Sequence, residues 1–185
     1  MGEQHKKHNR REHLNDFHLN VAGEYVYDGA LYACQNDDAK QRRSKRAVWG
    51  MAAILTVAVA AGGCIPAPGM QNCFYVLLPY LGEFLGAASV IWALVKLGTD
   101  WSTVREYNYK KSVAVLPVRT AVTAVFSLLG VVCELIFFFV NDHAGQTFFA
   151  LLYVLLKLIA LLSVLVLRAE IIQAEWDKLP KKDNF

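Results

Sequence analysis

Four ionisable residues stand within otherwise apolar stretches of the sequence: Glu83, Arg119, Glu134 and Lys157. An ionised side chain is costly inside a bilayer, so such residues usually face the interior of a helical bundle or a water-filled path. There they either hold helices together or carry a proton or a small solute. These residues therefore predict an intramembrane polar site.

Glu83 and Lys157 stand at matching depth in the sequence. At the rise of an α-helix, each lies about 15 Å from the outer start of its own apolar stretch, near the middle of a bilayer. Glu134 lies roughly 9 Å from the outer end of its stretch, and Arg119 lies in the inner third. We predict an ion pair between Glu83 and Lys157, with Glu134 as a second candidate partner of Lys157.

Small and polar residues accompany these charges at helical spacing. Gly82 and Gly86 flank Glu83 with the spacing that lets another helix approach closely. The stretch that contains Glu134 has a polar stripe at helical spacing. Its members are Arg119 or Thr120, Thr123, Ser127, Gly130 and Glu134.

Two interpretations of this polar site are open. In the first, the charges hold the helices in register, and Ser and Thr hydroxyls add hydrogen bonds between helices. In the second, Glu83 and Glu134 line a hydrated path, and Lys157 is the charge that a bound anion or carboxylate meets.

Helices that cross a membrane are needed to position these residues. Apolar residues make up 55% of the 185-residue chain, above the ~45–50% of soluble proteins. Four stretches have the ~20 mostly apolar residues that a spanning helix needs. They are 47–65, 73–97, 113–140 and 147–167. The sequence therefore predicts an all-α membrane protein, with a four-transmembrane-helix bundle over residues 47–168.

The basic residues of the connections predict the orientation. Lys and Arg residues precede the first span, lie between the second and third spans, and follow the fourth. The connections 66–72 and 141–146 contain neither. By the positive-inside rule, both termini are cytoplasmic in a multi-pass protein of the cell membrane.

The cytoplasmic ends are a polar, basic head (1–46) and a tail (169–185). In the head, Asp28-Gly29 is a favoured two-residue turn, which predicts a β-hairpin over residues 24–34 with Tyr25 opposite Tyr32. A lone hairpin is marginal in water, so we expect it to rest on a neighbouring part of the protein. The nearest candidates are the inner loop 101–111 and the interfacial ends of the spans. The alternative is an irregular amphipathic arm on the membrane surface.

Cys64 and Cys73 lie on either side of the outer connection 66–72. Disulfides persist in that compartment, and a bridge would tie the outer ends of the first two spans together. The alternative is a pair of free thiols. The spacing lacks the Cys-x-x-Cys arrangement of a redox-active pair.

No recognised catalytic or nucleotide-binding motif occurs in the sequence. The histidines His5, His8, His13 and His18 lack the spacing of a metal site, so neither a metal nor a cofactor is expected. Nucleic-acid binding is also not expected, because the basic residues lie at the predicted cytoplasmic boundary of the membrane.

The predicted function is therefore non-enzymatic: an accessory, regulatory or assembly subunit that acts through the bilayer and a membrane-protein partner or copies of itself. The alternative is a small transporter or proton-coupled permease that uses Glu83, Lys157 and Glu134.

Overall fold

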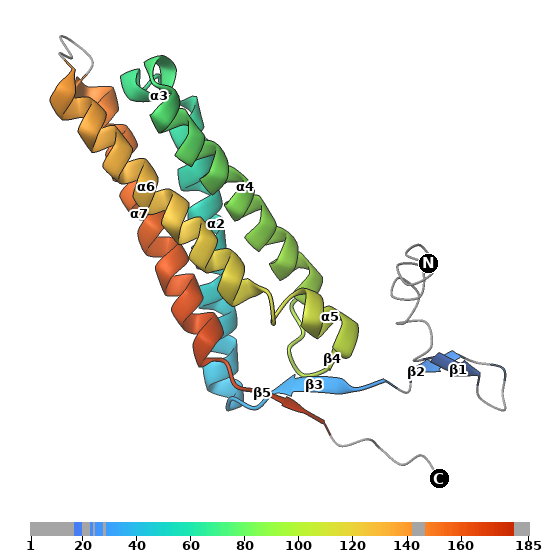
Figure 1. Cartoon of the computed structure of the whole chain (residues 1–185). Coiled ribbons are helices and arrows are strands. Elements are labelled where there is room, and N and C mark those ends of the chain that lie inside the picture. The colour runs from blue at the N-terminus through green and yellow to red at the C-terminus, as the bar shows by residue number, and fades with distance from the viewer. Residues whose placement is uncertain (1–16, 20–22, 24, 28, 142–146, 180–185) are drawn as a thin grey trace, which may run out of the picture.

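Four long helices form the body of the protein. The computed structural model describes residues 17–19, 23, 25–27, 29–141 and 147–179 (Figure 1). The helices are α2 (Asp38–Cys64), α4 (Phe74–Leu97), α6 (Leu116–Val140) and α7 (Thr147–Gln173). Each is long and apolar enough to cross a membrane. The predicted all-α bundle with four membrane-spanning helices is confirmed.

The helix boundaries differ from the predicted spans mainly at the end of the bundle where α2 begins and α7 ends. Helix α2 begins at Asp38, because its basic first turns consist largely of good helix formers and Asp38 favours a helix N-terminus. Helix α7 continues to Gln173. Helix α6 begins at Leu116, with Pro117 in its first turn, where a proline costs no hydrogen bond.

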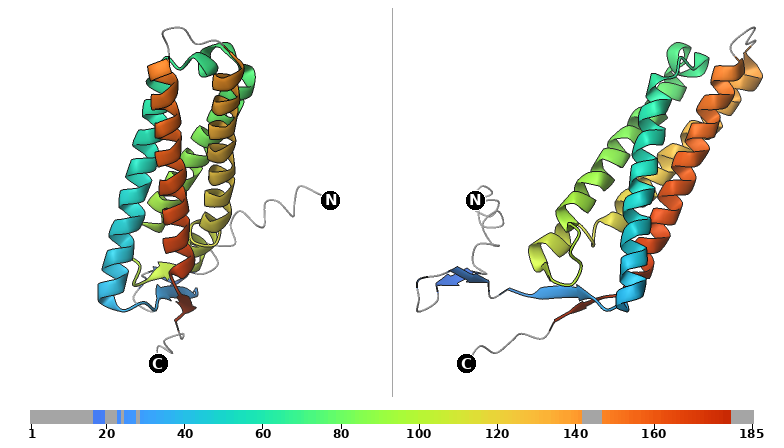
Figure 2. Two further views of the ribbon diagram at one scale, coloured as in Figure 1. Left: turned by 90° about the vertical axis from the view of Figure 1, so that its left-hand side faces the viewer. Right: turned by 180° about the vertical axis from the view of Figure 1, so that it is seen from behind.

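The four helices pack side by side in a fixed order. Helix α7 lies between α2 and α6, and α6 also lies against α4 (Figure 2). The α4–α6 contact is close because Gly82 and Gly86 have no side chains. A β-carbon on Gly86 would be 2.6 Å from Thr123 Oγ1, and one on Gly82 would overlap the Phe126 ring. The predicted close approach at these glycines is confirmed.

Apolar residues fill the bundle in three clusters along its length. The largest lies at the end near the sheet and includes Val48 of α2, Leu94 of α4 and Leu167 of α7. A middle cluster surrounds Leu55 of α2 and Val164 of α7. The third lies at the opposite end. The polar site lies among these clusters rather than on the surface.

A three-stranded antiparallel sheet covers the end of the bundle opposite the short helix α3 (Pro68–Asn72) (Figure 1). Its central strand is β3 (Leu31–Cys34). On one edge is β4 (Val104–Arg105), followed by the short helix α5 (Glu106–Lys111), and on the other is β5 (Trp176–Lys178). The register pairs Tyr32 with both Val104 and Lys178.

The predicted hairpin over 24–34 is wrong in its pairing. Strand β2 (Tyr25–Tyr27) pairs with β1 (Phe17–Leu19), not with β3. As a central strand, β3 gains a partner on each edge, and the ring of Tyr32 stacks on Tyr109 of α5 with centroids 4.1 Å apart. Folding back onto Tyr25, which is exposed, would offer less burial. The expected contact between the head and the inner loop is confirmed, because that loop supplies β4.

Strand β5 was not predicted. It brings Trp176 to Trp101 of the inner loop, with ring centroids 5.7 Å apart, and to Tyr109, at 6.0 Å. The sheet therefore joins the head, the inner loop and the segment after α7. The first three histidines of the head, residues 142–146 and residues 180–185 lie outside the described part of the chain, as does the side chain of His18.

Candidate intramembrane polar site

Glu83 of α4 and Lys157 of α7 form an ion pair at the centre of the bundle. Both residues are buried: the side chain of Glu83 is 0% exposed and that of Lys157 is 2% exposed. The pair joins two helices that each pack against both α2 and α6. The ion pair predicted from matching depth is confirmed.

The remaining partners of this pair come from three helices. Ser127 of α6 donates a hydrogen bond from Oγ to Glu83 Oε1 at 2.7 Å. The ammonium group of Lys157 lies 4.5 Å from the ring centroid of Tyr80 and 5.1 Å from that of Tyr153. Aromatic faces attract a cation, most strongly where water is excluded. The lysine charge is thus compensated by a carboxylate and two rings.

Gly130 of α6 lies next to this lysine. A β-carbon at that position would stand 3.6 Å from Lys157 Cδ and 3.8 Å from Nζ. A small substitution would remain in ordinary contact distance, whereas a longer side chain would displace the lysine. Gly130 was predicted as part of the polar stripe, and it lies beside Lys157.

Sequence reasoning missed Tyr80 and Tyr153. A signal was available, since Tyr80 precedes Glu83 by three residues and Tyr153 precedes Lys157 by four. Residues at these separations share one face of a helix. Tyr80 also donates a long hydrogen bond, 3.4 Å, from its hydroxyl to the carbonyl oxygen of Val59 in α2. This contact brings the fourth helix to the site.

The predicted polar stripe of α6 faces the interior of the bundle. Thr120, Thr123, Ser127 and Glu134 are all buried. However, Thr120 and Thr123 donate their hydroxyl hydrogens to carbonyl oxygens of α6 itself. The expected hydrogen bond between helices is therefore made by Ser127 and not by these threonines.

Arg119 lies at the inner end of the stripe and is half-buried. Its Nη1 donates a hydrogen bond of 2.6 Å to the carbonyl oxygen of Ser89 in α4. Arg168 of α7 makes a similar contact with the carbonyl oxygen of Pro117. Two arginines thus link α4, α6 and α7 near the sheet, one turn or more away from the Glu83–Lys157 pair.

Glu134 is fully buried toward the α3 end of the bundle. Its carboxylate lies against Gly69 of α3, where a β-carbon would overlap Oε2. The ion pair of Lys157 is made with Glu83, so the two glutamates occupy different levels of the same core. The Tyr153 hydroxyl is buried in this region without a hydrogen-bond partner among the described residues.

The predicted disulfide between Cys64 and Cys73 is not formed, and both thiols are free. Cys64 ends α2 and is exposed, whereas Cys73 packs against a buried cluster that contains Ala67, Val76 and Tyr153. Helix α3 occupies most of the connection between the two cysteines. The sulfurs therefore have different surroundings rather than a shared one.

In the described part of the chain, no group of three or more His, Cys, Asp or Glu residues is arranged to hold a metal ion. The comparisons with known proteins are also negative. No protein-family model matches the chain, and no curated protein or solved structure is similar to it at a significant level.

Proposed function

We propose that the protein is a non-enzymatic, multi-pass protein of the cell membrane that acts through a membrane partner or copies of itself. In this proposal the intramembrane charges hold the helices in one arrangement. The observation that supports it is the closure of the polar site, in which Glu83, Ser127 and Lys157 are buried and bonded to one another. A solute would have to displace these contacts to reach the charges.

Physical chemistry supports a structural role for such a pair. A buried ion pair often contributes little net stability, because both ions lose their hydration. Removing one partner is nevertheless strongly destabilising, so the pair disfavours arrangements in which the two charges are separated. A pair between α4 and α7, with Ser127 of α6 bonded to it, would fix the register of three helices at once.

The proposed orientation has both termini in the cytoplasm. The positive-inside rule supports it, because basic residues concentrate at the sheet end of the bundle. Five of them precede the first span: Lys40, Arg42, Arg43, Lys45 and Arg46. The sheet would then be cytoplasmic, and α3 would face the outside.

The experiment that tests the function uses paired variants. In Glu83→Gln/Lys157→Met both charges are removed and the core stays neutral. A structural pair predicts that this double variant folds and still co-purifies from native membranes with the proteins that the wild type retains. Loss of these proteins from a correctly folded double variant would contradict the proposal. Lys178→Met, at an exposed position, is the control for the loss of a charge.

A second candidate function is transport of a proton or small solute. One observation favours it: the core contains two buried carboxylates, Glu83 and Glu134, and the buried hydroxyl of Tyr153. Such groups are typical of proton relays in membranes. Flux in proteoliposomes separates the candidates, because transport predicts flux that Glu83→Gln abolishes. If the wild-type protein transports neither protons nor any solute of a broad panel, the partner proposal is favoured.

A further inference from the structure

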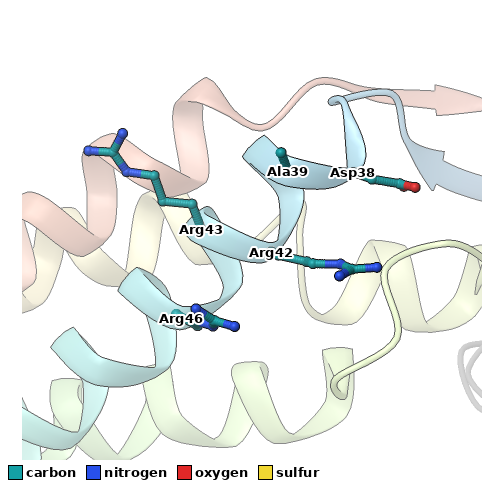
Figure 3. A pocket seen from close by; sticks show the side chains of 5 residues that line it. All are labelled: Asp38, Ala39, Arg42, Arg43 and Arg46. Atoms are coloured by element: carbon teal, nitrogen blue, oxygen red, sulfur yellow. The ribbon is translucent and has the colours of Figure 1, made fainter.

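A basic pocket lies on the first turns of α2, next to the start of the membrane-spanning segment. Its lining residues are Asp38, Ala39, Arg42, Arg43 and Arg46, and its volume is about 520 Å³. Figure 3 shows Arg42 and Arg46 extending from neighbouring turns of the helix, while Arg43 leaves from another side. The pocket is open to its surroundings and is separate from the Glu83–Lys157 site.

The described residues do not balance the charge of this pocket. Its lining includes three arginines and one carboxylate, that of Asp38. Among the described residues, none of the three arginines has an ion pair or a side-chain hydrogen bond. By contrast, Lys110 on α5 pairs with Glu106 at 2.6 Å, and Lys111 donates to Tyr107. The arginines are exposed, so their hydrogen-bond donors are free to meet an anion.

The position of the pocket relative to the predicted membrane span indicates the kind of anion that it binds. Arg46 is followed directly by Ala47, the first residue of the predicted span, and by Trp49, which is typical of the membrane interface. Lipid phosphates lie at this level. Guanidinium groups bind phosphate oxygens through two parallel hydrogen bonds, and basic pockets at the ends of membrane helices bind anionic headgroups.

We infer that Arg42 and Arg46, with Arg43 beside them, form a binding site for the phosphate of an anionic phospholipid. The site holds the lipid at the sheet end of α2. An acidic segment of a protein partner is less favoured, because the pocket lies at the level of headgroups that surround the protein at all times. The inference does not depend on the role of the Glu83–Lys157 pair.

Native mass spectrometry of the full chain in a neutral detergent tests the site. Phosphatidylglycerol is titrated, and phosphatidylcholine with the same acyl chains is the comparison. We expect one phosphatidylglycerol to bind at least about tenfold more tightly than phosphatidylcholine, and Arg42→Ala/Arg46→Ala to weaken it about tenfold, as expected for lost charge-assisted hydrogen bonds.

Two further variants separate a defined site from a general positive field. Lys110→Ala/Lys111→Ala removes the same charge from side chains that already have partners, and should change binding by less than roughly twofold, as for exposed charges. Arg42→Lys/Arg46→Lys keeps the charge but loses the planar donors, and should still weaken binding. Size-exclusion chromatography checks that each variant is folded.

Several outcomes would overturn the inference. Equal weakening by the arginine-to-alanine and lysine-to-alanine pairs would indicate a diffuse field, and full binding by Arg42→Lys/Arg46→Lys would remove the role of guanidinium geometry. Lack of preference for phosphatidylglycerol would exclude an anionic lipid. Inorganic phosphate that displaces the lipid at equal concentration would assign the pocket to a soluble phosphate instead.

Discussion

Gly69 of α3 lies directly against the carboxylate of Glu134 in α6, and a β-carbon at Gly69 would overlap Glu134 Oε2. The same β-carbon would stand 3.0 Å from the Phe137 ring. Helix α3 therefore packs over a buried acidic group because its second residue has no side chain. This contact closes the core at the end opposite the sheet.

Gly69→Ala should destabilise the protein. Overfilling a packed site costs about 1 to 3 kcal/mol. Gly50→Ala is the matched control, because Gly50 also lies in a helix but has open space around it; there alanine should be neutral or stabilise by up to about 1 kcal/mol. Thermal unfolding in detergent measures both. Equal unfolding temperatures of the two variants would mean that Gly69 is not needed for the packing of α3.

Removing the Glu134 carboxylate provides a second test of the contact between Gly69 of α3 and α6. In Gly69→Ala/Glu134→Ala, the overlapping carboxylate is absent, so the added methyl group should cost less than it does beside Glu134. Comparison with Glu134→Ala alone gives the cost of the methyl group in the emptied site. An unchanged cost would place the strain elsewhere, for example at the Phe137 ring.

Lys157→Met should be among the most destabilising single changes in the bundle. It leaves Glu83 buried without its counter-charge, which costs about 3 to 5 kcal/mol. Adding Glu83→Gln should restore much of that loss, because the pair is then neutral. Unfolding in detergent measures the single and double variants, with Lys178→Met as the exposed control. Equal stability of Lys157→Met and the control would exclude an important role for the pair in folding.

Charges inside apolar helices were predictable from sequence because their physical cost is large and local. The constant rise of a helix then placed Glu83 and Lys157 at the same level without any knowledge of the packing. The ring contacts of Tyr80 and Tyr153 were harder to predict, since they depend on which helices are neighbours. The depth of a residue can be counted along its own helix, but the sequence of that helix does not show which other helices lie beside it.

Strand pairing was the least predictable part of the fold. Asp28-Gly29 is a strong local turn signal, yet β3 pairs with β4 and β5 rather than with β2. Those partners come from distant parts of the sequence, and local propensity does not report them. The prediction of a disulfide was wrong for a related reason. The spacing of Cys64 and Cys73 does not predict the short helix that forms between them.

Trp176→Ala should loosen the sheet without unfolding the bundle. It removes ring contacts with Trp101 and Tyr109, each worth about 0.5 to 1.5 kcal/mol. Hydrogen exchange at residues 31–34 should accelerate roughly tenfold, since local opening becomes easier. Trp92→Ala, at an exposed position on the bundle, is the control. If both variants exchange alike, β5 does not stabilise the sheet.

Thiol labelling tests the proposed orientation. Cys64 is exposed at the α3 end of the bundle, so a membrane-impermeant maleimide added to intact cells should label it. A cysteine introduced by Lys178→Cys, in a chain with Cys64→Ser and Cys73→Ser, should react only after the membrane is opened. The reverse pattern would place the sheet outside the cell. Labelling of Cys64 under oxidising conditions also checks that its thiol is free.

The pairing of β3 with β5 sets an order of events during synthesis. Strand β3 leaves the ribosome before any membrane helix, but β5 follows the last of them. The sheet can therefore close only after all four helices have been made and both flanking segments lie on the same face of the bilayer. A chain inserted with one span missing would keep an unpaired edge of β3, which is the kind of exposed strand that quality-control proteases and chaperones encounter.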